Sequence, residues 1–126
     1  MLPLLRGPFY FLRHGETETN RMGLVAGATD VELNATGWQQ ARAAAELLRQ
    51  RGITAIYSSP LRRARDTAEC AAAALGLPLT IIAELAERSW GELEGKPRAL
   101  RVRDATPPGG EGPQQFAQRT LAGLAL

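Results

Sequence analysis

The sequence contains only one cysteine and one histidine, Cys70 and His14. A single cysteine excludes an intrachain disulfide and is typical of a protein from a reducing compartment. A single histidine means that no second imidazole of this chain can share the chemistry of a site. We therefore expect a cytoplasmic protein in which any imidazole chemistry depends on His14 alone.

Long apolar runs and a strong excess of charge are also missing. No apolar run approaches the roughly 20 residues that span a bilayer, and residues 1–6 lack the basic start and long apolar region of a signal peptide. The formal net charge is +2, which is too small to indicate nucleic acid as a partner. The 15 basic residues, nearly all arginine, instead indicate a small acidic partner. We expect no membrane and no nucleic-acid partner.

Composition and periodicity indicate one α/β domain over residues 1–126. Apolar residues make up 44% of the chain and charged residues 22%, which is ordinary for a folded domain. Short apolar runs predict strands, and apolar residues repeating at three and four predict helices. The strands are expected over residues 8–12, 53–57 and 79–82, and the helices over residues 36–51, 60–75 and 113–124. This alternation is typical of layered α/β folds.

Local signals predict where these helices begin and end. Thr36 and Gln39 are spaced as a capping box, and Ser59 stands as a cap before Pro60. Glycines follow the first two helices as expected C-terminal stops. The polar stretch over residues 16–30 has no clear period and is expected to form a long loop.

The first predicted strand ends in Arg13-His14-Gly15, a sequence suited to an anion. Arg13 can place two donors on a phosphate, and His14 is a nitrogen nucleophile that can be neutral near physiological pH. Gly15 lets the backbone turn and a ligand approach. Ligands of open α/β sheets gather at the carboxyl ends of strands, so Arg62 or Arg63, after the second strand, is expected in the same crevice.

Five ordered motifs resemble the histidine phosphatase superfamily, the phosphoglycerate mutase-like proteins. The match runs from about residue 9 to the end of the chain and is therefore far more specific than one Arg-His-Gly. The motifs are Leu12-Arg13-His14-Gly15-Glu16-Thr17-x-x-Asn20, Gly27-x-x-Asp30-x-x-Leu33-x-x-x-Gly37-x-x-Gln40-Ala41, Ser58-Ser59-Pro60-Leu61-x-Arg63-Ala64-x-x-Thr67-Ala68, Leu85-x-Glu87-x-x-Trp90-Gly91-x-x-Glu94-Gly95, and Gly109-Gly110-Glu111 followed by Phe116-x-x-Arg119.

The resemblance implies a role for individual residues. His14 would attack phosphorus and become a phosphohistidine, and Glu87 would protonate the leaving alcohol and then activate water. No metal and no cofactor is implied, because arginines spread the transferring charge. The substrate-binding residues that the resemblance implies are Arg13, Asn20, Arg63 and Gly27.

The resemblance also implies a fold and leaves three functions open. The expected fold is a three-layer α/β/α sandwich of the phosphoglycerate mutase-like type, with its C-terminal part missing. Family members carry a second His-Gly on a later strand, whereas His14 is alone here. The expected function is hydrolysis of a small phosphorylated metabolite through phosphohistidine. The alternatives are phosphoryl transfer of the mutase type and a catalytically impaired phosphate-binding or interaction remnant.

Simpler roles compete for several of these residues. Asn20 could cap a turn. Glu87 stands near Glu84, Glu92 and Glu94, and any of these carboxylates could be surface charge. Arg62 and Arg65 fit a solvated helix face. Trp38 and Trp90 are expected to pack, and Arg98, Arg101 and Arg103 to be exposed. A strand over residues 8–12 without a neighbour would leave an open sheet edge, through which a homo-oligomer is expected to form.

Overall fold

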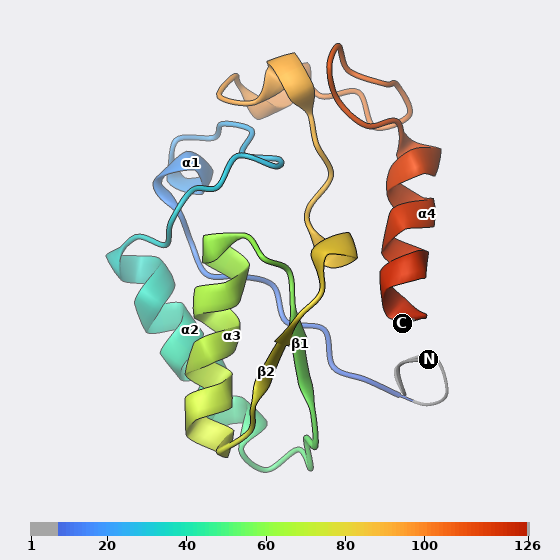
Figure 1. Ribbon diagram of the computed structural model, residues 1–126. Helices are drawn as coiled ribbons and strands as arrows, with labels where there is room; N and C mark the ends of the chain where they lie inside the picture. Colours follow the sequence, from blue (N-terminus) through green and yellow to red (C-terminus); the bar gives the residue numbers. More distant parts are fainter. Residues whose placement is uncertain (1–7, 126) are drawn as a thin grey trace.

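The computed structural model describes residues 8–125, so the prediction about a signal segment at residues 1–6 lies outside the described residues. Two helices and two short strands form the centre of the fold (Figure 1). The elements are α1 (Glu18–Arg21), α2 (Ala35–Leu48), β1 (Ile56–Ser58), α3 (Arg62–Leu75), β2 (Leu79–Ile81), the 3-10 turns η2 (Ala83–Leu85), η3 (Gly91–Leu93) and η4 (Arg98–Leu100), and α4 (Pro113–Leu124).

The sheet is a parallel pair joined by a helix. Ile56 lies opposite Leu79 and Ser58 opposite Ile81, and α3 crosses over between the two strands. Helix α3 packs against α2 and against both strands, whereas α4 packs against η2. Figure 1 shows α2 and α3 on one side of the strands and α4 on the other. The expected α/β class is therefore confirmed.

The prediction of a buried strand over residues 8–12 is wrong for the described structure. Residues 8–14 make no backbone hydrogen bond with another residue of the 8–125 range, because no described strand lies alongside them. The side chains are exposed as well: Phe9 to 48%, Tyr10 to 58%, Phe11 to 87% and Leu12 to 39%. Aromatic composition favours a strand, but a strand forms only when a neighbour completes its ladder.

Both helix caps come from residues other than those predicted. Helix α2 begins after Asn34, whose side-chain oxygen accepts from the Gly37 amide at 2.8 Å, so Thr36 lies inside the first turn. Helix α3 begins at Arg62, whose amide donates to Asp30 Oδ1 at 2.7 Å. The Ser59 hydroxyl accepts instead from the Leu61 amide at 3.1 Å. The side chain that satisfies the first amide of α3 therefore comes from a distant loop.

The helix ends were predicted more accurately. Gly76 ends α3 in the left-handed conformation, with φ +68°, and Pro113 begins α4. Helix α2 ends at Leu48, and Gly52 lies in the turn that follows, with φ +67°. The loop predicted over residues 16–30 contains one short helix, α1.

The packed core is small and rich in alanine. Its buried apolar side chains are Val25, Leu33, Ala41, Ala45, Ala68, Ala71, Ile82 and Trp90. Alanines on facing turns let α2 and α3 approach closely, as their predicted apolar stripes require. Within residues 8–125, no helix is both long and apolar enough to cross a bilayer.

Charged side chains organise the irregular segment after β2. Arg88 is 6% exposed and stacks on the Trp90 ring, with its guanidinium carbon 4.0 Å from the ring centroid. Its guanidinium donates to the carbonyl oxygens of Arg103, Ala105 and Glu111 at 2.8, 2.7 and 3.0 Å. This segment also pairs with the loop after α1, because the Val25 amide donates to the Lys96 carbonyl at 2.8 Å.

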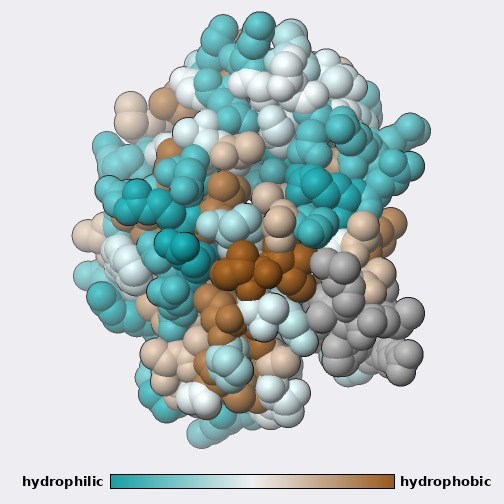
Figure 2. All heavy atoms as spheres, viewed as in Figure 1, coloured by the Kyte–Doolittle hydropathy of each residue, from teal (hydrophilic) through white to brown (hydrophobic). Residues whose placement is uncertain are grey.

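We propose that a second copy of the chain pairs with the exposed segment over residues 9–12. Hydrophobic surface gathers near the centre of Figure 2, in the region through which this segment runs in Figure 1. An extended segment whose backbone groups make no backbone hydrogen bond within residues 8–125 is complementary to an identical segment running antiparallel. Sedimentation should therefore detect species larger than the 13.6 kDa monomer.

Phe11→Asp should shift this equilibrium toward the monomer, because it would bury a charge in the interface. The control is Leu47→Asp on α2, where the native side chain is also exposed, to 71%. A wild-type chain that stays monomeric at every concentration would contradict the proposal.

Candidate active site

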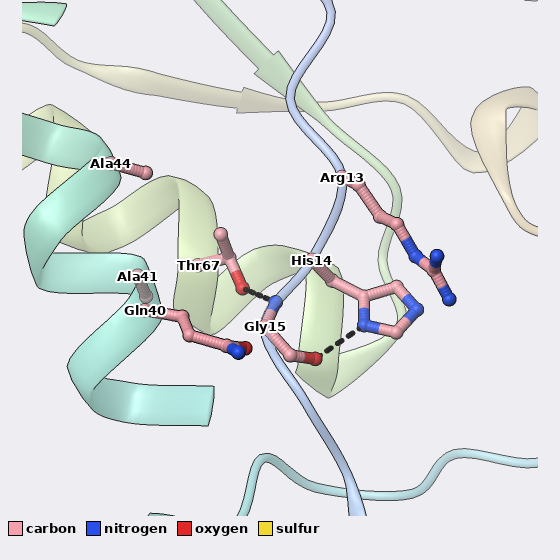
Figure 3. A pocket seen from close by; sticks show the side chains of 7 residues that line it. All are labelled: Arg13, His14, Gly15, Gln40, Ala41, Ala44 and Thr67. Atoms are coloured by element: carbon pink, nitrogen blue, oxygen red, sulfur yellow. Dashed lines mark hydrogen bonds between the residues drawn. The ribbon is translucent and has the colours of Figure 1, made fainter. Parts of the chain in front are cut away.

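His14 presents one ring nitrogen for chemistry. Its Nδ1 lies 2.6 Å from the carbonyl oxygen of Gly15 (Figure 3). A carbonyl oxygen only accepts hydrogen bonds, so Nδ1 carries the proton and Nε2 keeps its lone pair. The geometry therefore leaves Nε2 as the nucleophilic nitrogen.

The surroundings of His14 favour the neutral imidazole. Its pKa is lowered from 6.5 by burial first, and then by the positive charges of Arg63 and Arg13. The hydrogen bond to Gly15 and the charge of Glu87 act in the opposite direction but are outweighed. The charges of Arg63, Glu87 and Arg13 therefore all act on the predicted nucleophile. A neutral imidazole is the form that can attack phosphorus.

Close backbone approach holds the His14 segment against the helices. The Gly15 amide donates to the Thr67 hydroxyl at 3.1 Å, and this hydroxyl donates to the Arg63 carbonyl at 2.7 Å. A Cβ at Gly15 would collide with the Gly37 carbonyl at the start of α2. Gly15 is therefore required for close packing and not for a left-handed turn. Thr67, although part of a quoted motif, had no predicted role.

Arg63 joins three parts of the site. Its side chain is 1% exposed, and its Nη1 donates to the Thr29 carbonyl at 2.7 Å. Its Nη2 donates to the Gly27 carbonyl at 2.5 Å and to Glu87 Oε2 at 2.7 Å. The Glu87 side chain is 40% exposed, so this ion pair stands at the edge of the site. Arg63 and Glu87, which were both named from the motifs, thus form a direct ion pair.

Gly27 lies beside the carboxylate of Glu94, which could have been simple surface charge from the sequence alone. Gly27 has φ +57°, and a Cβ there would collide with the carboxylate of Glu94. Burial raises the pKa of Glu94, but hydrogen bonds to the carboxylate outweigh burial and lower it. Its donors are the Ala28 amide at 2.9 Å, the Trp90 amide at 2.9 Å and the Thr29 hydroxyl at 2.6 Å. Substrate binding by Gly27 stays a prediction, since its carbonyl is engaged with Arg63.

Asn20 caps helix α1. Its side-chain Oδ1 accepts from the backbone amide of the N-cap residue Thr17 at 3.0 Å. Its backbone amide donates to the Thr17 hydroxyl at 3.1 Å, which completes a capping box. This is the turn-capping alternative. The side-chain nitrogen of Asn20 makes no hydrogen bond with any residue in the 8–125 range, so donation to a phosphate stays a prediction.

Arg13 and His14 point away from α2. Figure 3 shows both side chains on the far side of the segment from Gln40, Ala41 and Ala44. A hollow of about 200 Å³ lies beside the segment and is lined by Arg13, His14 and Gly15, by Gln40, Ala41 and Ala44 of α2, and by Thr67 of α3. The described residues contain no cluster of three or more histidine, cysteine, aspartate or glutamate side chains that could hold a metal ion.

Known proteins are similar to this chain in both sequence and fold. The family model described as histidine phosphatase superfamily (branch 1) matches residues 9–125. "Uncharacterized phosphatase PhoE" of Bacillus subtilis is 38% identical over 117 residues, which cover 90% of this chain and 61% of that protein. "Probable phosphoglycerate mutase GpmB" of Salmonella newport is 38% identical over 130 residues, which cover 92% and 60%.

The solved structure of mycobacterial glucosyl-3-phosphoglycerate phosphatase with VO3 superposes with a TM-score of 0.84 at 34% identity. That match covers 90% of this chain and 61% of the mycobacterial chain. This chain therefore spans less than two thirds of the length of the relatives named here. Its sequence motifs, its fold and the family model agree: the chain belongs to the histidine phosphatase superfamily, branch 1.

Proposed function

We propose that the protein hydrolyses phosphomonoesters of small metabolites through a phosphohistidine on His14. The observation that carries this proposal is the Nε2 of the only histidine, which makes no hydrogen bond within residues 8–125 and is exposed to the charges of Arg13, Arg63 and Glu87. The names of two relatives, the phosphatase PhoE and the mycobacterial glucosyl-3-phosphoglycerate phosphatase, support hydrolysis as the reaction class.

The first step transfers the phosphoryl group to the protein. The lone pair of His14 Nε2 forms a bond to phosphorus as the bond to the leaving oxygen breaks. The protonated carboxyl of Glu87 gives its proton to that oxygen, and the alcohol departs. Arg13 and Arg63 offset the charge of the phosphoryl oxygens, which is the main requirement of phosphoryl transfer without a metal.

The second step reverses these roles. The Glu87 carboxylate takes a proton from a water molecule as its oxygen attacks phosphorus and the bond to Nε2 breaks. Inorganic phosphate leaves, His14 regains its lone pair, and Glu87 is again protonated. In the structure Glu87 pairs with Arg63. A phosphoryl group that takes over Arg63 Nη2 would free the Glu87 carboxyl for the leaving oxygen.

Transfer of the phosphoryl group to a second substrate is the alternative enzyme activity. The 38% identity to proteins named as probable phosphoglycerate mutases favours it. Product analysis separates the two reactions, because hydrolysis releases inorganic phosphate whereas transfer gives a new phosphate ester. Phosphate or vanadate binding without turnover would instead identify the impaired phosphate-binding form.

Incubation with a reactive phosphoryl donor such as phosphoramidate should give an adduct on His14 that is labile in acid and stable in base. Mass spectrometry should find this adduct in the wild type and in Cys70→Ser, which leaves the site intact. His14→Ala should lose both the adduct and most of the turnover, because covalent catalysis requires the nucleophile. An adduct that survives His14→Ala would exclude His14 as its acceptor.

The pKa of His14 should be measurable directly, because one histidine gives one set of imidazole signals in NMR. The titration midpoint should lie below 6.5, since burial and the two arginines destabilise the charged ring. Glu87→Gln should lower the midpoint further by removing the charge that raises it. The nucleophile therefore stays neutral as pH falls toward 6.5, and its contribution to activity is lost only below the shifted pKa. A midpoint above 6.5 would contradict the geometry.

Glu87→Gln should slow hydrolysis of alkyl phosphates by roughly 100- to 10,000-fold while phosphate still binds. Glutamine keeps the shape of the side chain but cannot donate and accept the proton that an alkoxide requires. Glu92→Gln, which changes an exposed neighbouring glutamate, is the matched control. Full activity of Glu87→Gln on an alkyl phosphate would show that another group is the acid.

A further inference from the structure

A half-buried side chain of α4, Arg119, contacts the segment that carries Glu87. Arg119 Nη1 donates to the carbonyl oxygens of Glu84 at 2.9 Å and Ala86 at 2.7 Å, and Arg119 Nη2 donates to that of Glu87 at 3.3 Å. One guanidinium therefore binds three carbonyl groups within four residues of chain. Arg119 belongs to the last of the five motifs, but the resemblance implied no functional role for it.

Glu111 completes this contact from the other side. Its Oε2 accepts from Arg119 Nε at 2.9 Å, and its Oε1 accepts from Arg119 Nη2 at 2.7 Å and from the Ser89 amide at 2.9 Å. The hydrogen bond from Arg119 lowers the pKa of Glu111, and the same bond raises the pKa of Arg119, so both groups stay charged at neutral pH. The Glu111–Arg119 pair thus contacts the backbone before and after Glu87.

Regular structure does not hold the Glu87 backbone. Residues 87–90 belong to no helix and no strand. Within the 8–125 range, the Glu87 side chain has one hydrogen-bond partner, Arg63, which the phosphoryl group would also bind. When a substrate occupies Arg63, the backbone of Glu87 must therefore determine where its carboxyl lies.

We propose that Arg119 and Glu111 are positioning residues, which hold the Glu87 backbone so that the carboxyl reaches the leaving oxygen. This inference rests on the proposed function, because it concerns the same acid. A displacement of about 1 Å in a catalytic group can cost about 100-fold in rate. Neither residue makes a hydrogen bond or an ion pair with His14.

The test is Arg119→Lys, which keeps the charge but cannot form the forked contact with a carboxylate and three carbonyl groups. Turnover of an alkyl phosphate should fall by roughly 10- to 100-fold with KM unchanged. The burst of 2,4-dinitrophenolate from the first turnover of 2,4-dinitrophenyl phosphate should change in rate by less than about threefold, because this leaving group departs without a proton and the step precedes the action of Glu87 as a base. Glu111→Gln should show the same selective loss.

The matched control is Arg49→Lys. Arg49 also joins a glutamate and a carbonyl group, with Nε 2.9 Å from Glu46 Oε2 and Nη1 2.9 Å from the Ala74 carbonyl oxygen. Arg49 lies at the end of α2 and contacts α3, away from Glu87. Arg49→Lys should therefore leave the rates with both esters unchanged. Arg119→Lys added to Glu87→Gln should cause no further loss on the alkyl phosphate, because a positioning residue acts only through the group that it positions.

The His14 titration gives a readout that needs no turnover. If Arg119→Lys displaces the Glu87 carboxylate, the His14 midpoint should fall toward that of Glu87→Gln, since Glu87 raises the pKa of His14. An unchanged midpoint, or a burst of 2,4-dinitrophenolate that is slowed as much as the turnover of the alkyl phosphate, would overturn the positioning role. A wild type that hydrolyses neither ester would refute the proposed function, and the titration would still decide the positioning role.

Discussion

The arrangement of the site depends on the burial of one guanidinium. Arg63 is 1% exposed, and its charge is compensated by two carbonyl groups and the Glu87 carboxylate. A buried charge is tolerated only when such partners are present, so the chain must bring the loop at Gly27 and the segment at Glu87 to the first turn of α3. The same charge lowers the pKa of His14. Arg63 therefore binds the predicted acid directly and adds to the burial that lowers the pKa of the predicted nucleophile.

Small residues make this arrangement possible. The alanine-rich interface lets α2 and α3 pack closely, and Gly15 and Gly37 bring the His14 segment against α2 without a side chain between them. Only at this distance can the Gly15 amide reach Thr67. Larger side chains at the two glycines would move the imidazole away from Arg63. We infer that these positions are constrained by packing first and by chemistry second.

Polar networks hold the rest of the chain, because the apolar core is small. Glu94, Arg88 and the Glu111–Arg119 pair each bind several backbone groups of irregular segments. Loss of one partner would leave a buried polar group unsatisfied, at a cost of about 1–3 kcal/mol. Such networks can hold a loop that carries a functional side chain where no regular element passes. They also explain how Glu87 can lie on irregular backbone and still face the same site as His14.

Local sequence by itself determined the helices and singled out the candidate site residues. Alanine spacing predicted α2 and α3, Gly76 and Pro113 marked helix ends, and the motifs singled out His14, Arg63 and Glu87, because each signal lies within a few residues of the chain. Tertiary structure alone decided which partners these groups have. Asp30 reaches the Arg62 amide across 32 positions, Glu94 reaches Ala28 across 66, and residues 8–12 remain outside the described sheet because a strand needs a neighbour. Hydrogen bonds between distant segments depend on where the whole chain brings its backbone, and no local pattern specifies that.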